Sequence, residues 1–410
     1  MAIIDNEENA NFEEDRKYMT DVKLYNKWEE YGLDANLLKG IYAMGFETPS
    51  FIQKAAIKPI IDGCDIRAQA QSGTGKTGAF AIGALQSLDQ SLQATQVLVL
   101  VSTREIAAQN ANRFVDFSKF MDVNICLLAG GSPVQVDIKN LAANPHVVVG
   151  TPGRVEQMIN EGHLNTEKIK LFIIDEADEM LQAGFQEQVR NIFMALNRKT
   201  IQIAMFSATY EEEELTVSEE ILNDPVIIDL RQSEQTLIGI KQFVINLGED
   251  TSFRKNDLTS KLSTLVDLFK HHKFGQTVIF VTAKERAKYI YEGLNNEGIP
   301  CECITADLMQ AEREQVLDRF RSGKNRILVS SGLLSRGVDI QDLSVVFCLD
   351  VPPPNKKSTY IHRIGRSGRY GKKGIAILVL HKHEMQNLKE IEKFYNTKVK
   401  DFTWDDFNGS

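Results

Sequence analysis

The sequence is poor in the residue patterns that bind metal ions or form disulfides. It contains five cysteines and seven histidines, which are scattered along the chain. The cysteines stand at Cys64, Cys126, Cys301, Cys303 and Cys348, and no two of them form a CxxC pair. No zinc-binding spacing is therefore present. Free thiols in a reducing compartment are expected.

Long apolar runs and a secretory pattern are lacking as well. No apolar run approaches the length that spans a membrane, and the N-terminal segment carries Glu7, Glu8, Glu13 and Glu14. We therefore expect a cytoplasmic protein without a membrane partner, with a nuclear location as the alternative. The net charge of −9 gives no support to a general nucleic-acid binder. A local basic groove is still allowed, because binding follows the distribution of charge rather than its sum.

The length of 410 residues exceeds what one hydrophobic core usually holds, so two domains are expected. The expected order is an acidic disordered tail (1–20), a first lobe (21–230), a linker (231–240) and a second lobe (241–410). Helical patterning over residues 28–61 is followed by apolar runs that alternate with helical segments. The runs expected as strands are 97–101, 147–149, 171–174, 201–206, 278–281, 326–330, 345–349 and 375–380. This alternation predicts an α/β fold with a doubly wound parallel sheet in each lobe.

A glycine-rich stretch at residues 70–77 reads Ala-Gln-Ser-Gly-Thr-Gly-Lys-Thr. It matches a phosphate-binding loop, except that Ala70 replaces the first glycine. Gly73 and Gly75 allow backbone N–H groups to converge on phosphate oxygens at the start of a helix. Lys76 is expected to reach the outer phosphates, and the Thr77 hydroxyl to hold Mg²⁺. A flexible glycine-rich turn is the alternative, and the helical run after Thr77 argues against it.

A second stretch places four apolar residues at 171–174 directly before Asp175, Glu176 and, after one alanine, Asp178. Such a run is typical of a buried strand in a parallel sheet. The acids would then lie at the carboxyl end of the strand, where open α/β sheets bind ligands. The alternative is a strand followed by an acidic, solvated turn. Taken with the phosphate loop, the carboxylates predict a nucleotide-hydrolysing site.

Asp175-Glu176-Ala177-Asp178 spells the signature of the DEAD-box RNA helicases, and the other motifs of that family follow in order. Within the family the chain resembles initiation factor 4A and its near relatives. That likeness rests on residues 37–43 (Leu-Leu-Lys-Gly-Ile-Tyr-Ala) and 239–243 (Gly-Ile-Lys-Gln-Phe). The resemblance extends over approximately residues 22–400 and implies that both lobes are RecA-like.

The resemblance implies an adenine site formed by Trp28, which would cover the base, and Gln53, whose amide would read its edge. Thr48 falls at a nearby nucleotide-contacting position. By themselves these side chains would be interpreted as a core tryptophan and a surface glutamine. The residues expected to hold the phosphates are Ser72, Gly73, Thr74, Gly75, Lys76 and Thr77.

The resemblance also implies the hydrolytic roles. Asp175 would hold Mg²⁺ through water, and Glu176 would orient and deprotonate the attacking water. Asp178 is expected to bond toward Ser207 and Thr209, in the motif that links hydrolysis to RNA binding.

The second lobe would supply the remainder of the ATP site. In the run from His362 to Arg369, the family motif assigns Arg366 and Arg369 as arginine fingers and His362 to coupling. A solvated basic turn is the alternative. Asp339 matches the family's contact to the nucleotide sugar. Since Lys76 is on the other lobe, the site would be complete only when the lobes close, with ATP favouring closure and hydrolysis relaxing it.

The RNA contacts implied by the resemblance are sequence-independent and involve phosphates and the 2′-OH of single-stranded RNA. In the first lobe they are Thr103, Arg104, Gly131, Thr151, Gly153 and Arg154. In the second lobe they are Lys284, Gln310, Arg313 and Ser331.

This sequence departs from the family pattern at several of the RNA positions. Ser102 replaces the usual proline before Thr103. On the second lobe, unusual residues stand at 282–283, 305–306 and 331–332. We therefore predict a weaker grip of the second lobe on RNA, while the ATP contacts are retained.

The sequence thus predicts an ATP-dependent RNA helicase that uses Mg²⁺ and separates short duplexes locally, in translation initiation. The alternative is an ATP-gated RNA clamp, as in exon-junction-type complexes. A third possibility is a regulatory subunit that needs a helical-repeat scaffold protein to dock both lobes. Such a scaffold is the expected protein partner, and the chain itself is expected to be a monomer.

Overall fold

The structure is a computed structural model. It describes residues 20–70, 73–181, 185–230, 240–249, 257–305, 307–332, 343–353, 357–367, 374–395 and 397–404. The chain divides into two compact units, Met1–Glu234 and Gln235–Ser410, which we call the first and second lobe. The division falls within the stretch expected as a linker. Residues 231–239 and the tail at 1–19 lie outside the described part of the chain.

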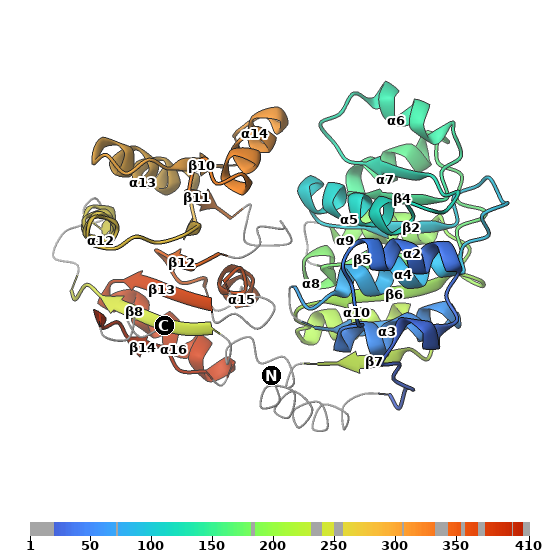
Figure 1. Ribbon diagram of the computed structural model, residues 1–410, viewed down its shortest axis with the longest axis horizontal. Helices are drawn as coiled ribbons and strands as arrows, with labels where there is room; N and C mark the ends of the chain where they lie inside the picture. Colours follow the sequence, from blue (N-terminus) through green and yellow to red (C-terminus); the bar gives the residue numbers. More distant parts are fainter. Residues whose placement is uncertain are drawn as a thin grey trace. The chain divides into compact units, whose positions relative to one another are not determined.

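The described residues of the first lobe form a seven-stranded sheet in the order β3-β4-β2-β5-β6-β1-β7 (Figure 1). All neighbouring strands are parallel. The strands are β1 Ile66–Gln69, β2 Val97–Leu100, β3 Ile125–Leu128, β4 Val147–Gly150, β5 Leu171–Asp175, β6 Gln202–Ser207 and β7 Val226–Asp229. The short runs of Val, Ile and Leu at β2, β4 and β5 are fully buried, as expected for the centre of a parallel sheet.

Helices cover both faces of this sheet (Figure 1). They are η2 Trp28–Tyr31, α2 Ala35–Ala43, α3 Phe51–Ile61, α4 Lys76–Ser87, α5 Arg104–Phe117, α6 Val134–Leu141, α7 Pro152–Asn160, α8 Ala177–Met180, α9 Gln186–Met194 and α10 Glu212–Ile221. Alternate strand residues point to opposite faces. Val97, Val99 and Ile173 join one core cluster with α2–α5, while Leu98, Leu100 and Ile174 join the other with α7 and α9.

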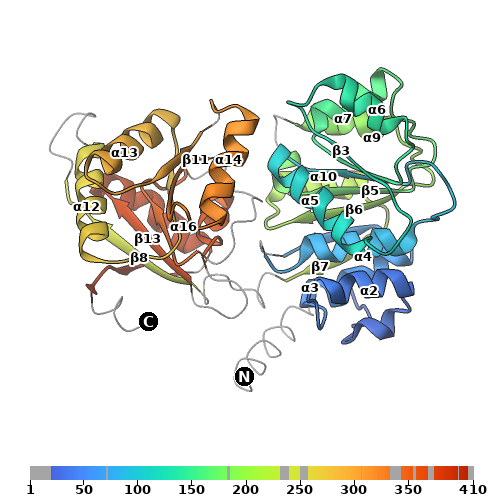
Figure 2. The same cartoon turned by 45° about the horizontal axis from the view of Figure 1, so that its top comes forward.

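The second lobe repeats this architecture. Its strands are β8 Ile240–Asn246, β9 Thr277–Val281, β10 Glu302–Ile304, β11 Ile327–Ser331, β12 Val345–Cys348, β13 Gly374–Leu380 and β14 Lys400–Asp401. Its helices are α12 Asp257–His271, α13 Lys284–Asn296, α14 Gln310–Arg321, α15 Ser358–Ile364, η4 Lys382–Glu384 and α16 Met385–Phe394. Helices α12 and α13 pack against one face of the sheet side by side (Figure 2).

The strand order shows that the two lobes are structural duplicates. The second sheet runs β10-β11-β9-β12-β13-β8-β14, so each strand occupies the place of the first-lobe strand seven numbers lower. The prediction of two doubly wound parallel α/β lobes is confirmed. Each of the eight expected runs coincides with a strand to within a few residues. Strands β1, β3, β7, β8, β10 and β14 were not among the predicted runs.

A buried ion pair joins the carboxyl end of β12 to α15 in the second lobe. Arg363 Nη1 donates to Asp350 Oδ1 at 2.8 Å and to the Asp350 carbonyl oxygen at 3.2 Å. The other carboxylate oxygen accepts the Thr282 backbone N–H at 2.7 Å. Burial raises the pKa of the Asp350 carboxyl, but Arg363 and the Thr282 amide outweigh burial and hold the pKa below its usual range.

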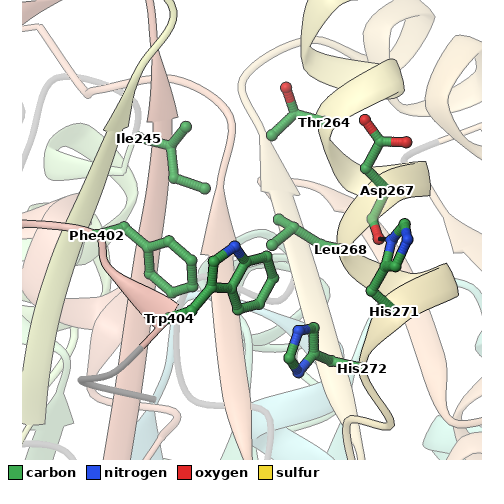
Figure 3. Close-up of a pocket in the computed structure, with 8 residues that line it drawn as sticks. All are labelled: Ile245, Thr264, Asp267, Leu268, His271, His272, Phe402 and Trp404. Atoms are coloured by element: carbon green, nitrogen blue, oxygen red, sulfur yellow. Dashed lines mark hydrogen bonds between the residues drawn. The ribbon is translucent and has the colours of Figure 1, made fainter. Parts of the chain in front are cut away.

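A pocket of about 760 Å³ lies in the second lobe between α12 and the segment around β14 (Figure 3). Trp404 stacks on the His272 ring with centroids 3.9 Å apart and meets Phe402 edge-on. The residues that line the pocket are Ile245, Thr264, Asp267, Leu268, His271, His272, Phe402 and Trp404. None of them is a predicted site residue. Among the described residues, no helix combines the length and apolar character needed to cross a membrane.

We predict that Asp350→Asn lowers the free energy of unfolding of the second lobe by about 3 kcal/mol, because it leaves the buried Arg363 guanidinium without its counter-charge. A carboxyl with a lowered folded-state pKa contributes stability above its unfolded pKa of about 3.9, and this is lost as pH falls through the folded value. The difference between wild type and variant should therefore be full at neutral pH and shrink in acid. Urea unfolding followed by pulsed hydrogen exchange with mass spectrometry reads the two lobes separately.

The matched control is Glu297→Gln, which removes one partner of the exposed pair with Lys270 (2.6 Å) in the same lobe. Its effect should stay below about 1 kcal/mol. Equal effects of the two substitutions would show that the Asp350–Arg363 pair contributes no more to the stability of the second lobe than an exposed ion pair does.

Candidate functional site

The phosphate loop connects β1 to α4 at the carboxyl edge of the first sheet. Gly73 and Gly75 have φ of 88° and 105°, in the left-handed region that favours glycine. A Cβ at Gly75 would lie 2.7 Å from Gln53 Nε2, so a side chain at this position would also collide. The Lys76 ammonium donates to the Ala70 carbonyl oxygen at 2.5 Å. Ser72 lies outside the described residues.

The two predicted catalytic carboxylates follow each other at the end of β5. Asp175 is the last residue of the strand, and Glu176 adopts φ 54° and ψ 51°, which is uncommon for a residue with a side chain. Both side chains are buried, with 5% and 6% of their surface exposed. The Ser102 hydroxyl donates to Glu176 Oε2 at 2.8 Å. Such backbone strain, which costs about 1–3 kcal/mol, is found mainly at functional sites.

Electrostatics explain why these carboxylates are unusual. Burial raises the pKa of Asp175, while the Lys76 ammonium and the Asn110 amide act in the opposite direction. Burial, together with the neighbouring acids, first Glu179 and then Asp175, raises the pKa of Glu176 to about 8. Ionisation of these carboxyls is therefore disfavoured, and a bound cation would stabilise their charged forms.

Asn110 is a residue of this site that the sequence did not single out. The Thr77 hydroxyl donates to Asn110 Oδ1 at 3.4 Å, and Asn110 Nδ2 donates to Asp175 Oδ2 at 3.1 Å. Asn110 is 1% exposed and lies on the apolar face of α5, with Ile106 and Phe114. A polar amide at a core-facing helix position was the available signal, since buried polar groups need partners.

The residues present fit a magnesium ion bound together with a nucleotide. Mg²⁺ prefers hard oxygen ligands and usually takes one or two carboxylates together with substrate phosphates. The Thr77 hydroxyl and the Asp175 carboxylate are such ligands. The Asn110 amide connects them by one hydrogen bond to each. Among the described residues, no group of three or more His, Cys, Asp or Glu forms a metal site of its own. In a magnesium site of this kind, substrate phosphates would supply further ligands.

The expected contact between Asp178 and the β6 motif is present. The Thr209 hydroxyl donates to Asp178 Oδ2 at 2.8 Å. The Ser207 hydroxyl oxygen accepts the backbone N–H groups of both Asp178 and Thr209, each at 3.3 Å. The role of this network in coupling hydrolysis to RNA stays a prediction.

The three residues expected to bind adenine do not form an open binding surface in the first lobe. Trp28 is fully buried, and its Nε1 donates to the Phe46 carbonyl oxygen at 2.9 Å. This is the core tryptophan that the sequence allowed as the alternative. Gln53 Oε1 accepts the Ser50 N–H at 2.8 Å, and Gln53 Nε2 donates to the Gly75 carbonyl oxygen at 3.3 Å. Gln53 thus supports the phosphate loop, Thr48 is exposed, and the adenine roles of all three residues stay predictions.

Some of the predicted RNA residues of the first lobe lie together. A Cβ at Gly131 would lie 2.0 Å from Arg104 Nη1, so the guanidinium passes directly over this glycine. Thr103 is the N-cap of α5, and Thr151 is the N-cap of α7, which includes Gly153.

Arg154 is already engaged with side chains of its own lobe. It forms an ion pair with Asp137 and donates to the Ser132 carbonyl oxygen at 3.1 Å. A phosphate would have to compete with these partners for the guanidinium.

The predicted RNA residues of the second lobe are only partly described. Lys284 pairs with Asp307 at 3.0 Å, and Arg313 Nε donates to the Leu308 carbonyl oxygen at 3.1 Å. Ser331 ends β11. Gln310 begins α14, but its side chain lies outside the described part of the structure.

The predicted ATP contacts of the second lobe are described at two positions. His362 and Arg366 are each 1% exposed, and Arg366 Nε donates to the His362 carbonyl oxygen at 3.2 Å. Asp339 and Arg369 lie outside the described residues.

Comparison with known proteins places these residues in a family. Residues 50–217 match the DEAD/DEAH box helicase family, and residues 260–371 match the helicase conserved C-terminal domain. The ATP-dependent RNA helicase eIF4A of Encephalitozoon cuniculi is 62% identical over 385 residues, which cover 93% of this chain and 91% of that protein. The chain belongs to the eIF4A family of DEAD-box RNA helicases.

Solved structures of related helicases share the fold. S. cerevisiae Dbp5 bound to RNA and ADP BeF3 is 32% identical, with a TM-score of 0.85, over 94% of this chain and 98% of that one. A variant of the same Dbp5 bound to a Gle1 variant and IP6 is 31% identical, with a TM-score of 0.75, over 95% and 98%. The expectation of two RecA-like lobes of a DEAD-box helicase is confirmed.

Family membership gives the geometry of the first lobe its chemical meaning. The DEAD/DEAH box match includes the phosphate loop, both carboxylates at the end of β5 and the Ser207–Thr209 motif. The protein is a member of an ATP-hydrolysing helicase family, and the roles of the individual residues in these elements stay predictions. Asn110 and Ser102, which contact the two carboxylates, lie within the same matched range.

We predict that Asn110→Leu weakens Mg²⁺-ATP binding by about tenfold, because Asp175 loses the amide that orients it and outer-shell changes typically cost 10–100-fold in metal affinity or activity. The measurement is the affinity for a fluorescent ATP analogue at several Mg²⁺ concentrations. The weakening should be largest at low Mg²⁺.

Asn112→Leu is the matched control, since Asn112 is exposed on the same helix. It should leave the affinity unchanged. An Asn110→Leu protein that binds Mg²⁺-ATP as the wild type does would refute a role for Asn110 in this site.

Proposed function

We propose that this protein closes its two lobes on single-stranded RNA with ATP bound and separates short duplexes locally, in translation initiation. The observation that carries the proposal is the assembly of Lys76, Thr77, Asp175 and Glu176 at the carboxyl edge of one sheet. These residues supply a phosphate-binding cation, two metal ligands and a general base. The proposed role in translation rests on the likeness to relatives that carry the name eIF4A.

Each residue has a distinct part in the proposed hydrolysis. The Lys76 ammonium would exchange the Ala70 carbonyl oxygen for the outer phosphates. Thr77 and Asp175 would hold Mg²⁺, which neutralises charge on the phosphates when bound. Glu176 would orient the attacking water and accept its proton. The buried carboxyl of Glu176 can accept a proton only when it is itself deprotonated.

RNA would bind across the loops that follow β2, β3 and β4. Arg104 over Gly131 presents a guanidinium together with backbone groups, a combination suited to phosphates. The Asp178–Thr209 bond links the carboxylate motif to the end of β6 and supports a path from the RNA side to the ATP side.

The second lobe would complete the ATP site with Asp339, Arg366 and Arg369, in the closed form. We expect the second lobe to bind RNA more weakly than a lobe with the usual family residues at these positions. Lys284 already pairs with Asp307, which also accepts from Lys288 at 3.2 Å, so a phosphate would have to compete with that carboxylate. A helical-repeat scaffold that docks both lobes would compensate, and the proposed location is the cytoplasm.

We predict that Lys76→Ala and Glu176→Gln separate binding from hydrolysis. Lys76→Ala removes the cation for the outer phosphates and should weaken ATP binding itself. Glu176→Gln retains size and hydrogen bonding but cannot accept a proton, so binding should remain nearly intact while turnover stops. Nucleotide affinity and single-turnover hydrolysis at saturating RNA are measured for both.

Wild-type turnover by Glu176→Gln would remove Glu176 from the mechanism. Unwinding of a short RNA duplex by the wild-type protein separates the helicase from an RNA clamp. A helicase releases the strand in an ATP-dependent reaction, whereas a clamp holds RNA with an ATP analogue and leaves the duplex paired.

A further inference from the structure

The hydroxyl of Ser102 contacts the proposed general base directly. It donates to Glu176 Oε2 at 2.8 Å, and both side chains are buried, at 7% and 6% exposure. Among the described residues, no other group donates a hydrogen bond to this carboxylate, and no cation pairs with it. A buried carboxylate with a single donor depends on that donor for its orientation.

The register of the sheet produces this contact. Strands β2 and β5 are parallel neighbours, with Leu100 opposite Ile174. Ser102 and Glu176 each lie two residues beyond that pair, so the chain brings them to the same point at the carboxyl edge. Glu176 itself adopts a left-handed backbone, and its carboxylate meets the Ser102 hydroxyl there.

The second lobe contains the same arrangement with a different outcome. Cys348 lies opposite Phe280, and two residues beyond that pair the Thr282 N–H donates to Asp350 at 2.7 Å. There the carboxylate is neutralised by Arg363 and forms part of the core. In the first lobe the Ser102 hydroxyl makes the contact that corresponds to the Thr282 N–H, and no cation among the described residues pairs with the carboxylate. The carboxylate is held, but its basicity is not quenched by a fixed positive charge.

We propose that Ser102 is a positioning residue that holds the Glu176 carboxylate in the orientation needed for the attacking water. The inference rests on the proposed role of Glu176 as the base. Ser102 directly precedes Thr103 and Arg104, which begin α5 and are predicted to contact RNA. A shift of this segment on RNA binding would therefore move the hydroxyl that donates to Glu176. This would be a second path from the RNA side to the ATP side, besides the one through Asp178.

The test compares Ser102→Ala, which removes the hydroxyl, with Ser102→Thr, which retains it. Hydrolysis is measured with saturating ATP and RNA, together with KM for ATP, the half-saturating RNA concentration and thermal unfolding. We expect Ser102→Ala to lower kcat about tenfold, which corresponds to about 1.4 kcal/mol in the barrier. KM and the half-saturating RNA concentration should change less than about twofold. Ser102→Thr should restore most of kcat.

Glu176→Gln is measured in parallel to separate the two claims. If Glu176→Gln is inactive while Ser102→Ala has wild-type kcat, the inference fails and the proposed function stands. If Glu176→Gln hydrolyses ATP normally, both fail. A raised KM without a change in kcat, equal losses in Ser102→Ala and Ser102→Thr, or a faster Ser102→Ala protein would each overturn the positioning role.

Discussion

The parallel register of the strands is the constraint on which the rest of the molecule depends. In the first lobe β5 lies between β2 and β6, and β1 follows β6. Parallel strands end at the same edge, so the phosphate loop after β1, the carboxylates at the end of β5 and the motif at the end of β6 meet without long loops. The repeated order in the second lobe shows that the framework is duplicated, while the side chains at its edge differ.

A buried cluster of acids is stable only when its charge is compensated. In the second lobe the compensation is permanent, because Arg363 is buried against Asp350. In the first lobe Asp175 accepts a hydrogen bond from Asn110 and lies near the Lys76 ammonium, and Glu176 accepts one from Ser102. The carboxylates are therefore stabilised mainly by neutral hydrogen-bond donors. Such a site is energetically incomplete and favours a divalent cation with a nucleotide. The left-handed backbone of Glu176 is consistent with strain retained for function.

The fold could be predicted from the sequence because most central parallel strands are short apolar runs. The glycine-rich and carboxylate motifs of the expected ATP site are also visible as local patterns, although the roles of their residues stay predictions. The missed strands have other signals: β1 carries Arg67 and Gln69, whose polar side chains bond to Ser218 and to the Ala208 carbonyl oxygen. Asn110 and Ser102 contact partners that are far away in the sequence, at 65 and 74 positions. Single-residue patterns do not reveal such pairs.

Residue type also predicted poorly which side chains are available to bind RNA. Arg154 and Lys284 fit the RNA motif, yet each is paired with an aspartate in its own lobe. These settings depend on tertiary packing, which a motif does not specify.

Under the proposed function, the first lobe binds ATP but needs an arginine from the second lobe to hydrolyse it. The most direct test is RNA-stimulated hydrolysis by Arg366→Ala, with ATP affinity and thermal unfolding measured on the same protein. We expect ATP affinity to be retained while turnover falls by on the order of 10³-fold, a loss typical of an arginine finger, or by less if Arg369 substitutes in part. A folded Arg366→Ala protein that hydrolyses ATP at the wild-type rate would contradict it.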